Sequence, residues 1–421
     1  MKIAVTGSIG SGKSTLCKKL GELLPEFTIV SVDNVVHSVY EDADFLAQLQ
    51  LEFGVSTRKA ASDLVFLDAT KRKALETMSR SYLKTKITAA FATDNIIVEF
   101  PLLFEMSNFA DTADLVISVG CGDAIQTQRV MSRDNMSPEK IQGVRAAQFS
   151  RELRAALSDI YVDTGLPEFD QEKTRIEIVS RVRMHQLKLS ALDFFGDVGE
   201  VIWSIIENCY TQSQRHYHRP WHLYELFTAL KPHLAGHPNS CAMTLAAWFH
   251  DIVYETDATS YPNNEAASAK AMLYVITKHL PEWMNTDGTM REQVYLAAEI
   301  IVATKSHKIT ADWVRSKPDH LHAAELVIDA DMSILGAEPG RLAQYDSQIA
   351  CEWDQPPGQE TFAFCTGRLN ALRAFKAASP VFLTQEFHEL ESTAQANIDH
   401  LIDFWMQRVA MHTQKMVCVA Q

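Results

Sequence analysis

The first part of the chain alternates short apolar runs with amphipathic segments. Apolar runs of strand length occupy residues 2–6, 27–32, 96–100 and 115–119. Helical periodicity occupies residues 16–24, 45–51, 71–91 and 123–133 between and after them. Strands that alternate with helices form right-handed crossovers, which build a parallel sheet covered by helices on both faces. The pattern predicts an α/β domain whose ligands bind at the carboxyl ends of the strands.

The second part of the chain has helical periodicity and almost no strand alternation. Apolar side chains at Leu245, Trp248, Phe249, Ile252 and Val253 follow the spacing i, i+3, i+4, i+7, i+8, which predicts one helix with a single buried stripe. Upstream, residues 166–172 resemble a loop, and a helix that ends near residue 195 closes the first domain. We therefore predict an α/β domain over residues 1–195 and an all-helical domain over residues 196–421.

Composition and charge narrow the class of protein. The chain has 421 residues, 47% hydrophobic and 22% charged, with a net charge of −14, which argues against binding to nucleic acids or anionic membranes. No apolar stretch is long enough to cross a bilayer; residues 96–104 form a short one that Glu99 and Pro101 interrupt. Seven cysteines without a C-x-x-C pair fit a reducing compartment. With a strand starting at Lys2 and no leader before it, we expect a soluble cytoplasmic protein that binds small molecules.

A glycine-rich loop follows the first strand. Its residues are Gly7, Ser8, Ile9, Gly10, Ser11, Gly12, Lys13, Ser14 and Thr15, which match G-x-x-x-x-G-K-[ST] between a strand and a helix. Backbone N–H groups of such a loop hold the phosphates of ATP, helped by the dipole of the following helix. We expect Lys13 to reach the β- and γ-phosphates and Ser14 to bind Mg²⁺. The alternative is a simple Gly/Ser turn.

Acidic residues follow the strands at the edge where the nucleotide is expected. Asp33 comes after the second apolar run, and the segment 101–105 after the third. A carboxylate at this edge can accept a proton from an attacking hydroxyl or help to hold Mg²⁺. For Asp33, a helix-capping or turn residue is the alternative.

Several arginines gather after the fourth strand. They are Arg129, Arg133, Arg145, Arg151 and Arg154. Guanidinium groups on a mobile helical segment can clamp the oxygens of a phosphoryl group during transfer, as in the lid of a small-molecule kinase. A solvated helix face is the alternative.

These segments together resemble the dephospho-coenzyme A kinase family across roughly residues 1–190. The matching stretches are 6–15, 101–105, 128–134 and 147–159. The resemblance implies a P-loop kinase fold with a helical lid, ATP and Mg²⁺ as cofactors, and the ribose 3′-hydroxyl of dephospho-coenzyme A as the acceptor. It also implies that Asp33 is the base and that Arg129, Arg133 and Arg151 contact phosphates.

Four positions depart from the pattern of that family. Ser31 stands where the family has the first carboxylate of Asp-x-Asp, and Arg80-Ser81 stands where it has His-Pro. Asp163 takes the place of an asparagine. None of these changes affects the ATP loop, so they bear on the acceptor. Another nucleoside or nucleotide hydroxyl is the alternative acceptor.

Histidines are concentrated in the second part: of 15 in the chain, only His37 precedes His185. His218 and His222 are spaced i, i+4, on one face if that segment is helical. His250 and Asp251 are adjacent, and Asp329 and Asp331 lie in an otherwise apolar segment, where unpaired charge is costly. Such a mixed set of imidazoles and carboxylates suits Mn²⁺, Fe²⁺, Zn²⁺ or, less well, Mg²⁺. An adjacent His-Asp pair on a helix surface is the alternative.

This pattern resembles the HD superfamily of metal-dependent phosphohydrolases over roughly residues 200–410. The resemblance implies an all-α HD domain with metal ligands His222, His250, Asp251 and Asp331. His218 and Asp329 are then alternate ligands or partners that orient the ligands. Glu265 is implied as a proton carrier and His307 as a phosphate contact, with satisfied core residues as the alternative.

The two resemblances together predict a bifunctional enzyme, a kinase fused to a phosphohydrolase. A second interpretation makes the kinase-like part an ATP-binding module that regulates the phosphohydrolase, because one carboxylate is missing before Asp33. In a third interpretation, the second part of the chain binds a metal that serves only as a structural scaffold. The sequence names neither the phosphohydrolase substrate nor the oligomeric state.

Overall fold

The computed structural model divides the chain into two compact units, Met1–Val182 and Arg183–Gln421. It describes residues 1–57, 59–61, 64, 69–93, 95–106, 110–146, 148–256, 263–285, 288–316, 318–377 and 379–419. The division falls inside helix α9 (Glu168–Phe195), whose last residue is the boundary that the sequence analysis chose. Within the described ranges, no helix combines the length and the apolar character needed to cross a bilayer.

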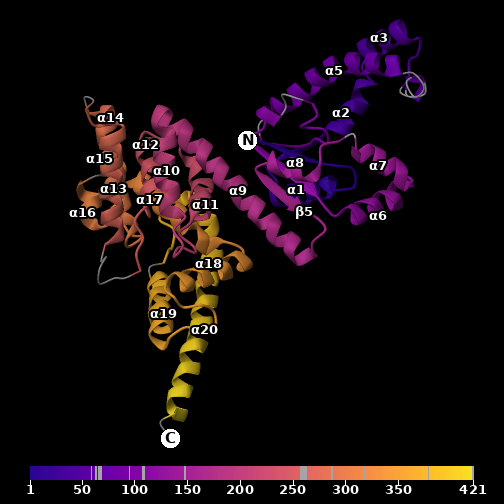
Figure 1. Ribbon diagram of the computed structural model, residues 1–421. Helices are drawn as coiled ribbons and strands as arrows, with labels where there is room; N and C mark the ends of the chain where they lie inside the picture. The colour runs from indigo at the N-terminus through magenta and orange to yellow at the C-terminus, as the bar shows by residue number, and fades with distance from the viewer. Residues whose placement is uncertain are drawn as a thin grey trace. The chain divides into compact units, whose positions relative to one another are not determined.

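A five-stranded parallel sheet forms the centre of the first unit (Figure 1). Its strands are β1 (Lys2–Gly7), β2 (Thr28–Ser31), β3 (Ile96–Glu99), β4 (Leu115–Gly120) and β5 (Ile160–Asp163), in the order β2-β3-β1-β4-β5. The parallel α/β expectation is thereby confirmed. The fifth strand, β5, was not predicted.

The sheet register brings the functional edge together. Val5 pairs with Glu99 on one side and with Ile117 on the other, so the carboxyl ends of β1, β3 and β4 lie side by side. The strand order reverses around β1, and ligands of open parallel sheets bind at such a point. The three central strands are almost wholly buried, as expected for strands covered on both faces.

Helices surround this sheet. Those of the first unit are α1 (Lys13–Leu23), α2 (Val32–Val39), α3 (Ala43–Phe53), α5 (Ala69–Phe91), α6 (Asp123–Asp134), α7 (Pro138–Ala146) and α8 (Arg151–Ala156). Helix α1 packs on β1, β2 and β3, and α8 packs on β4. Helix α3 joins α5 through an edge-to-face contact between Phe45 and Tyr82, with ring centroids 5.2 Å apart.

Two predicted boundaries in this unit were wrong. Strand β2 ends at Ser31, and Asp33 is the second residue of α2 instead of the end of a strand. The predicted loop at 166–172 is mostly helix, because α9 begins at Glu168. The N–H of Gln171 bonds to the carbonyl of Pro167 at 3.1 Å, and proline favours the start of a helix because its missing N–H is not needed there.

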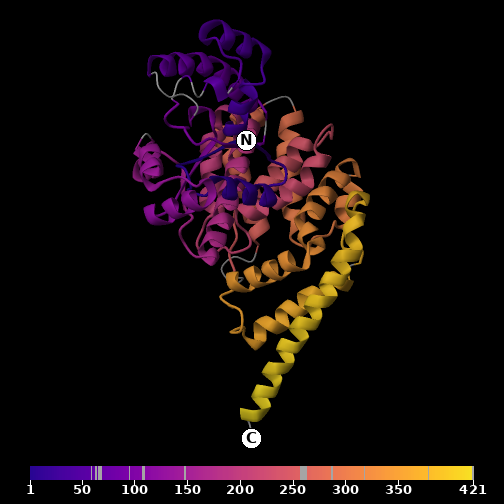
Figure 2. The same cartoon turned by 90° about the vertical axis from the view of Figure 1, so that its right-hand side faces the viewer.

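The second unit is helical, with no strand among its described residues (Figure 2). Its α-helices after α9 are α10 (Gly199–Tyr210), α11 (Pro220–Leu230), α12 (Ser240–Phe249), α13 (Asn264–His279), α14 (Pro281–Asn285), α15 (Thr289–Thr304), α16 (Ala311–Ser316), α17 (Leu321–Met332), α18 (Pro339–Glu352), α19 (Phe362–Ala377) and α20 (His388–Val419). Helix α12 packs against α11, α13, α15 and α17 and contributes Trp248 and Phe249 to the core.

Helix α12 is shorter than predicted. It ends at Phe249, His250 is its C-cap, and Asp251 lies in the turn beyond. The guanidinium of Arg215 donates to the carbonyls of Asp251 and Ile252 at 2.7 and 3.0 Å. These bonds satisfy two carbonyls of the turn that follows the helix. His218 also lies outside α11, which starts at Pro220, so His218 and His222 do not share a helix.

Candidate functional site

The loop between β1 and α1 has the backbone of a phosphate-binding loop. Gly12 has a φ of 96°, which side chains other than glycine rarely adopt. A Cβ atom there would lie 3.2 Å from Oγ1 of Thr164. That hydroxyl donates to the carbonyl of Ser11 at 2.6 Å, and the amide of Gln126 donates to Ser8 and Ile9. The loop is therefore held in shape by residues outside it.

Lys13 and Ser14 stand at the start of α1. Nζ of Lys13 donates to the carbonyl of Ser8 at 3.1 Å, and burial lowers the pKa of this ammonium although the nearby carboxylates oppose the shift. Oγ of Ser14 donates to Oε1 of Glu99 at 2.6 Å. A serine hydroxyl beside a carboxylate from the neighbouring strand is the arrangement that holds Mg²⁺ in P-loop proteins. Glu99 was not predicted as a site residue, although it is the last residue of β3 and therefore lies at the edge where ligands bind.

A pocket of about 330 Å³ opens beside this loop. It is lined by Gly12, Lys13 and Ser14, and by arginines that include Arg129 and Arg133. Arg129 is fixed by bonds of 2.9 and 2.8 Å to the hydroxyl and carbonyl of Thr164. Arg133 is exposed and pairs with Asp134, so its guanidinium can turn toward a bound anion.

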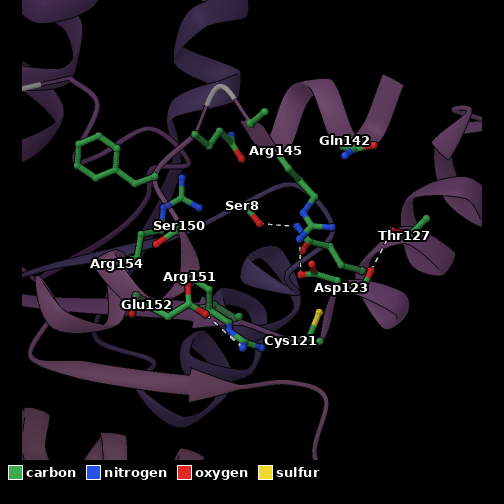
Figure 3. A pocket seen from close by; sticks show the side chains of 18 of the residues that line it. Ser8, Cys121, Asp123, Thr127, Gln142, Arg145, Ser150, Arg151, Glu152 and Arg154 are labelled. Atoms are coloured by element: carbon green, nitrogen blue, oxygen red, sulfur yellow. Dashed lines mark hydrogen bonds and ion pairs between the residues drawn. The ribbon is translucent and has the colours of Figure 1, made fainter. Parts of the chain in front are cut away.

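A second, larger pocket of about 760 Å³ contains other arginines (Figure 3). Arg145, Arg151 and Arg154 line it together with Ser8 of the phosphate loop. Arg154 is 3% exposed and pairs with Glu105 at 2.7 Å, while Arg145 pairs with Asp123. Arg151 is half-exposed, 3.4 Å from Glu152. The structure therefore distributes the predicted arginine cluster over two pockets that share the loop.

Asp33 lines neither pocket. Its side chain is exposed in the first turn of α2, although its charge acts on Lys13 and Arg133. Ser81 donates to the carbonyl of Met78 at 2.9 Å, and Arg80 is exposed.

Two other parts of the family pattern are Asp163 and the stretch 147–159. Oδ1 of Asp163 accepts the N–H of Gly165 at 2.8 Å, which leaves this carboxylate in a local turn at the end of β5. Of the predicted stretch 147–159, Ala147 lies outside the described residues.

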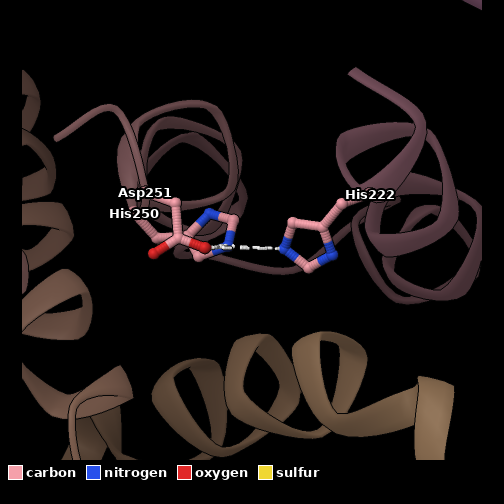
Figure 4. A group of neighbouring side chains, drawn as sticks. All are labelled: His222, His250 and Asp251. Atoms are coloured by element: carbon pink, nitrogen blue, oxygen red, sulfur yellow. Dashed lines mark hydrogen bonds and ion pairs between the residues drawn. The ribbon is translucent and has the colours of Figure 1, made fainter. Parts of the chain in front are cut away.

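In the second unit, the side chains of His222, His250 and Asp251 converge (Figure 4). Nε2 of His222 on α11 lies 3.0 Å from Nε2 of His250 after α12. Oδ2 of Asp251 lies 3.1 Å from Nε2 of His250 and 3.7 Å from that of His222. From α17, Oδ1 of Asp331 lies 3.3 and 3.7 Å from the same two nitrogens. Of the four residues that we expected to bind a metal, His222, His250 and Asp251 have donor atoms within 4.8 Å of one another, and Asp331 contacts both histidines.

The outer nitrogens of both imidazoles have partners. Nδ1 of His250 donates to the carbonyl of Ala247 at 3.0 Å, and Nδ1 of His222 lies 3.1 Å from the hydroxyl of Tyr217. A carbonyl accepts only, so the neutral His250 ring carries its proton on Nδ1 and directs the lone pair of Nε2 into the cluster. This orientation of a histidine by an outer partner is typical of metal ligands. The donor set therefore fits a divalent cation.

The two carboxylates of the cluster, Asp251 and Asp331, have lowered pKa values. Burial would raise the pKa of Asp251, but His250 and His218 hold it well below its usual value. Burial would likewise raise the pKa of Asp331, and contacts with the surrounding histidines lower it instead. Although burial opposes it, the carboxylates in turn raise the pKa of His250 and of His218. Protons on these rings therefore balance the two carboxylates, and a divalent cation would take their place.

The remaining predicted residues fall into two groups. His307 joins the cluster, with Nε2 3.4 Å from Oδ2 of Asp331, and Nε2 of His218 lies 3.7 Å from Oδ2 of Asp251. Asp329 does not join it: its carboxylate accepts the N–H groups of Leu383 and Thr384 at 2.7 Å. Positions two apart on a helix face different directions, so Asp329 and Asp331 separate.

In the described part of the chain, no hydrogen bond or ion pair links Glu265, in the first turn of α13, to the cluster, so its role stays a prediction. Two unpredicted residues support the cluster instead. Arg215 is fully buried and bonds the carbonyls of Asp251 and Ile252, and Glu352 contacts His218. Neither had a sequence signal, since each acts on residues distant in the chain.

Comparison with known proteins assigns the first unit. A family model described as dephospho-CoA kinase (CoaE) matches residues 1–167. The dephospho-CoA kinase of Dechloromonas aromatica is 31% identical over 202 residues, which cover 45% of this chain and 94% of that protein. The enzyme of the same name from Xanthomonas euvesicatoria is 31% identical, covering 43% of this chain and 95% of that protein.

A solved structure of a dephospho-CoA kinase from Campylobacter jejuni is also similar. It is 22% identical and has a TM-score of 0.34, with 43% of this chain and 96% of that one covered. A TM-score this low carries no weight, so the assignment depends on the sequence relatives.

Proposed function

The chain belongs to the dephospho-CoA kinase family, and from that premise we propose that its first unit transfers the γ-phosphoryl group of ATP to the ribose 3′-hydroxyl of dephospho-CoA. The hydrogen bond between Ser14 and Glu99 is the observation that carries this proposal. It places a hydroxyl and a carboxylate beside a glycine-rich loop, at the reversal point of the sheet.

The loop residues Gly7 to Thr15 hold the phosphates of ATP in this proposal. The N–H groups at the start of α1 and the ammonium of Lys13 face the β- and γ-phosphates. Ser14 and Glu99 would hold Mg²⁺, which neutralises charge on the phosphate oxygens when bound. Lys13 now bonds to the carbonyl of Ser8, and it exchanges this neutral partner for an anionic one when ATP binds.

The acceptor side depends on Asp33 and the arginines. Asp33 follows β2 at the functional edge and accepts the proton of the 3′-hydroxyl as the phosphoryl group is transferred. Arg129 and Arg133 contact the phosphates of ATP from the smaller pocket, and Arg151 faces the larger one. Arginine suits this task because its fork of donors matches phosphate oxygens.

The test is phosphorylation by the purified full chain. It is incubated with ATP, Mg²⁺ and dephospho-CoA, and the product is identified by mass spectrometry. We expect CoA as the product and no CoA from the Lys13→Ala variant. Adenosine, AMP and NAD replace dephospho-CoA in parallel reactions, since Ser31 and Arg80 depart from the family pattern. Preference for one of these would assign another nucleotide hydroxyl.

For the second unit we propose metal-dependent hydrolysis of a phosphoester. The convergence of His222, His250, Asp251 and Asp331 supports it. These residues would hold Mn²⁺, Fe²⁺, Zn²⁺ or Mg²⁺, and a bound ion of this kind activates water and polarises a phosphoryl oxygen. His307 lies beside Asp331 and is 28% exposed, so it can contact the phosphate.

Release of phosphate from a panel of phosphomonoesters and nucleotides tests this second activity. The full chain is first treated with a chelator and then supplied with each metal in turn. We expect hydrolysis that requires added metal and that disappears in Asp251→Asn. Tight ATP binding without phosphoryl transfer, together with an effect of ATP on hydrolysis, would instead assign the first unit a regulatory role.

A further inference from the structure

The carboxylate of Glu352 accepts hydrogen bonds from the segment that precedes α11. Glu352 is the last residue of α18, and its side chain is fully buried. Its Oε1 accepts three consecutive backbone N–H groups, from His216, Tyr217 and His218, at 2.8, 2.8 and 2.9 Å. Its Oε2 lies 2.8 Å from Nδ1 of His218. One buried carboxylate thus fixes both the backbone and the ring of His218.

This contact determines which nitrogen of His218 carries the proton. The N–H groups on Oε1 hold the carboxylate in its ionised form, and an ionised carboxylate can only accept. Nδ1 of His218 must therefore be the donor. In the neutral ring, Nε2 then has no proton and presents its lone pair, as in histidines that bind metal ions through one nitrogen while a carboxylate holds the other.

The direction of Nε2 follows from the packing of the ring. Tyr254 stacks on the imidazole of His218 with centroids 3.9 Å apart and an interplanar angle of 28°. Tyr217 contacts the imidazole edge-on, with centroids 4.9 Å apart. Held between these rings, Nε2 lies 3.7 Å from Oδ2 of Asp251, the same oxygen that faces His250 and His222.

We infer that Glu352 is a positioning residue that presents Nε2 of His218 as a fifth donor to the divalent cation of the second unit. The inference rests on the proposed phosphohydrolase function, because it assumes that the cluster binds a metal. Three imidazoles and two carboxylates exceed the four ligands of a closed zinc site. They suit a six-coordinate ion such as Mn²⁺ or Fe²⁺, with one position open for water or phosphate.

Glu352→Gln tests the inference with almost no change of shape. The amide oxygen of glutamine can accept the same three N–H groups, while its NH₂ donates to Nδ1 of His218. The proton of the ring then moves to Nε2, which can no longer bind a cation. We expect Mn²⁺ affinity to fall by about 10- to 100-fold with little change in the thermal unfolding midpoint. Glu360→Gln is the matched control, because Glu360 is a buried glutamate that bonds to Gly358 and Arg408.

Metal-free full-length protein is titrated with Mn²⁺ by calorimetry, and pulsed EPR counts the imidazole nitrogens on the ion. We expect three coupled histidines in the wild type and in Glu360→Gln, and two in Glu352→Gln. Two in the wild type, or unchanged affinity in Glu352→Gln, would overturn the inference. A wild type that binds no divalent metal rejects the proposed function itself.

His218→Phe keeps the inference testable if Glu352→Gln does not fold. The phenyl ring retains the stacking on Tyr254 and removes both nitrogens. We expect the same loss of Mn²⁺ affinity and the same count of two coupled histidines. Affinity equal to that of the wild type would contradict a role for His218 as a donor.

Discussion

The hydroxyl of Ser14 donates a 2.6 Å hydrogen bond to Oε1 of Glu99, which joins the first turn of α1 to the last residue of β3. If both groups hold Mg²⁺, Glu99→Gln removes a charged ligand while preserving the shape. We expect kinase turnover at limiting Mg²⁺ to fall by about 10- to 100-fold and to recover partly as Mg²⁺ is raised. Steady-state rates measured across a Mg²⁺ series check this expectation.

Glu22→Gln is the control for that experiment. Glu22 is exposed on α1 and pairs with Lys19, so its charge can be removed without affecting the loop. Equal Mg²⁺ dependence in both variants would mean that Glu99 does not contribute to the metal site.

Gly12→Ala should damage the phosphate loop through the backbone. A left-handed residue with a Cβ atom costs about 1–2 kcal/mol, and this Cβ would press on Thr164. We expect weaker ATP binding and a lower unfolding midpoint, measured by calorimetry and by thermal scans.

Gly143→Ala provides the contrast. Gly143 lies in α7 with open space at the Cβ position, and alanine is favoured over glycine in a helix by roughly 0.5–1 kcal/mol. This variant should keep or gain stability. Loss of ATP binding in both variants would show a general sensitivity of the unit instead of a strained loop.

Glu105 carries the buried ion pair of the larger pocket. It accepts both Arg154 at 2.7 Å and the N–H of Phe149 at 2.8 Å. Glu105→Ala leaves the guanidinium buried without its partner, which costs roughly 3 kcal/mol of unfolding free energy. Glu152→Ala removes the exposed partner of Arg151 and should lower the unfolding free energy far less, because an exposed ion pair is screened by solvent. Denaturant titrations compare the two, and equal losses would contradict the burial argument.

Arg215 connects two segments of the metal cluster. Its guanidinium donates to the carbonyls of Asp251 and Ile252 and, at 3.3 Å, to that of His218. Arg215→Met fills the space but leaves these buried acceptors without donors, at about 1–3 kcal/mol each. We expect a large fall in the unfolding midpoint and weaker Mn²⁺ binding.

Arg219→Met serves as the comparison, because Arg219 is an exposed arginine four residues away. Its unfolding midpoint and Mn²⁺ affinity should match those of the wild type. Normal Mn²⁺ affinity in a folded Arg215→Met protein would show that the turn does not depend on the guanidinium.

Local patterns predicted what local interactions determine. The apolar runs predicted four of the five strands. Three of these, β1, β3 and β4, are central strands, and strands buried on both faces are continuous and apolar. The phosphate-binding loop could be predicted because all of its defining residues lie within nine adjacent positions, 7–15. The four residues expected to bind metal contact one another in the structure, and the resemblance to the HD superfamily is what selected them.

Non-local contacts account for what the sequence could not predict. The turn after helix α12 is held by Arg215, which bonds to the carbonyl of Asp251, 36 positions along the chain. Glu99 bonds to Ser14, which lies 85 positions away in the chain, and Glu352 contacts His218, which lies 134 positions away. Helical or strand periodicity carries no information about such contacts. Asp329 and Asp331 are equivalent in the sequence pattern, but the carboxylate of Asp329 accepts the N–H groups of Leu383 and Thr384.

The most direct test of the account assays both activities in one preparation of the full chain. CoA formation from dephospho-CoA and metal-dependent phosphate release are measured for the wild type, Lys13→Ala and Asp251→Asn. The account predicts that Lys13→Ala loses only the first activity and Asp251→Asn loses only the second. Loss of both activities in either folded variant would contradict two separate phosphate-handling sites.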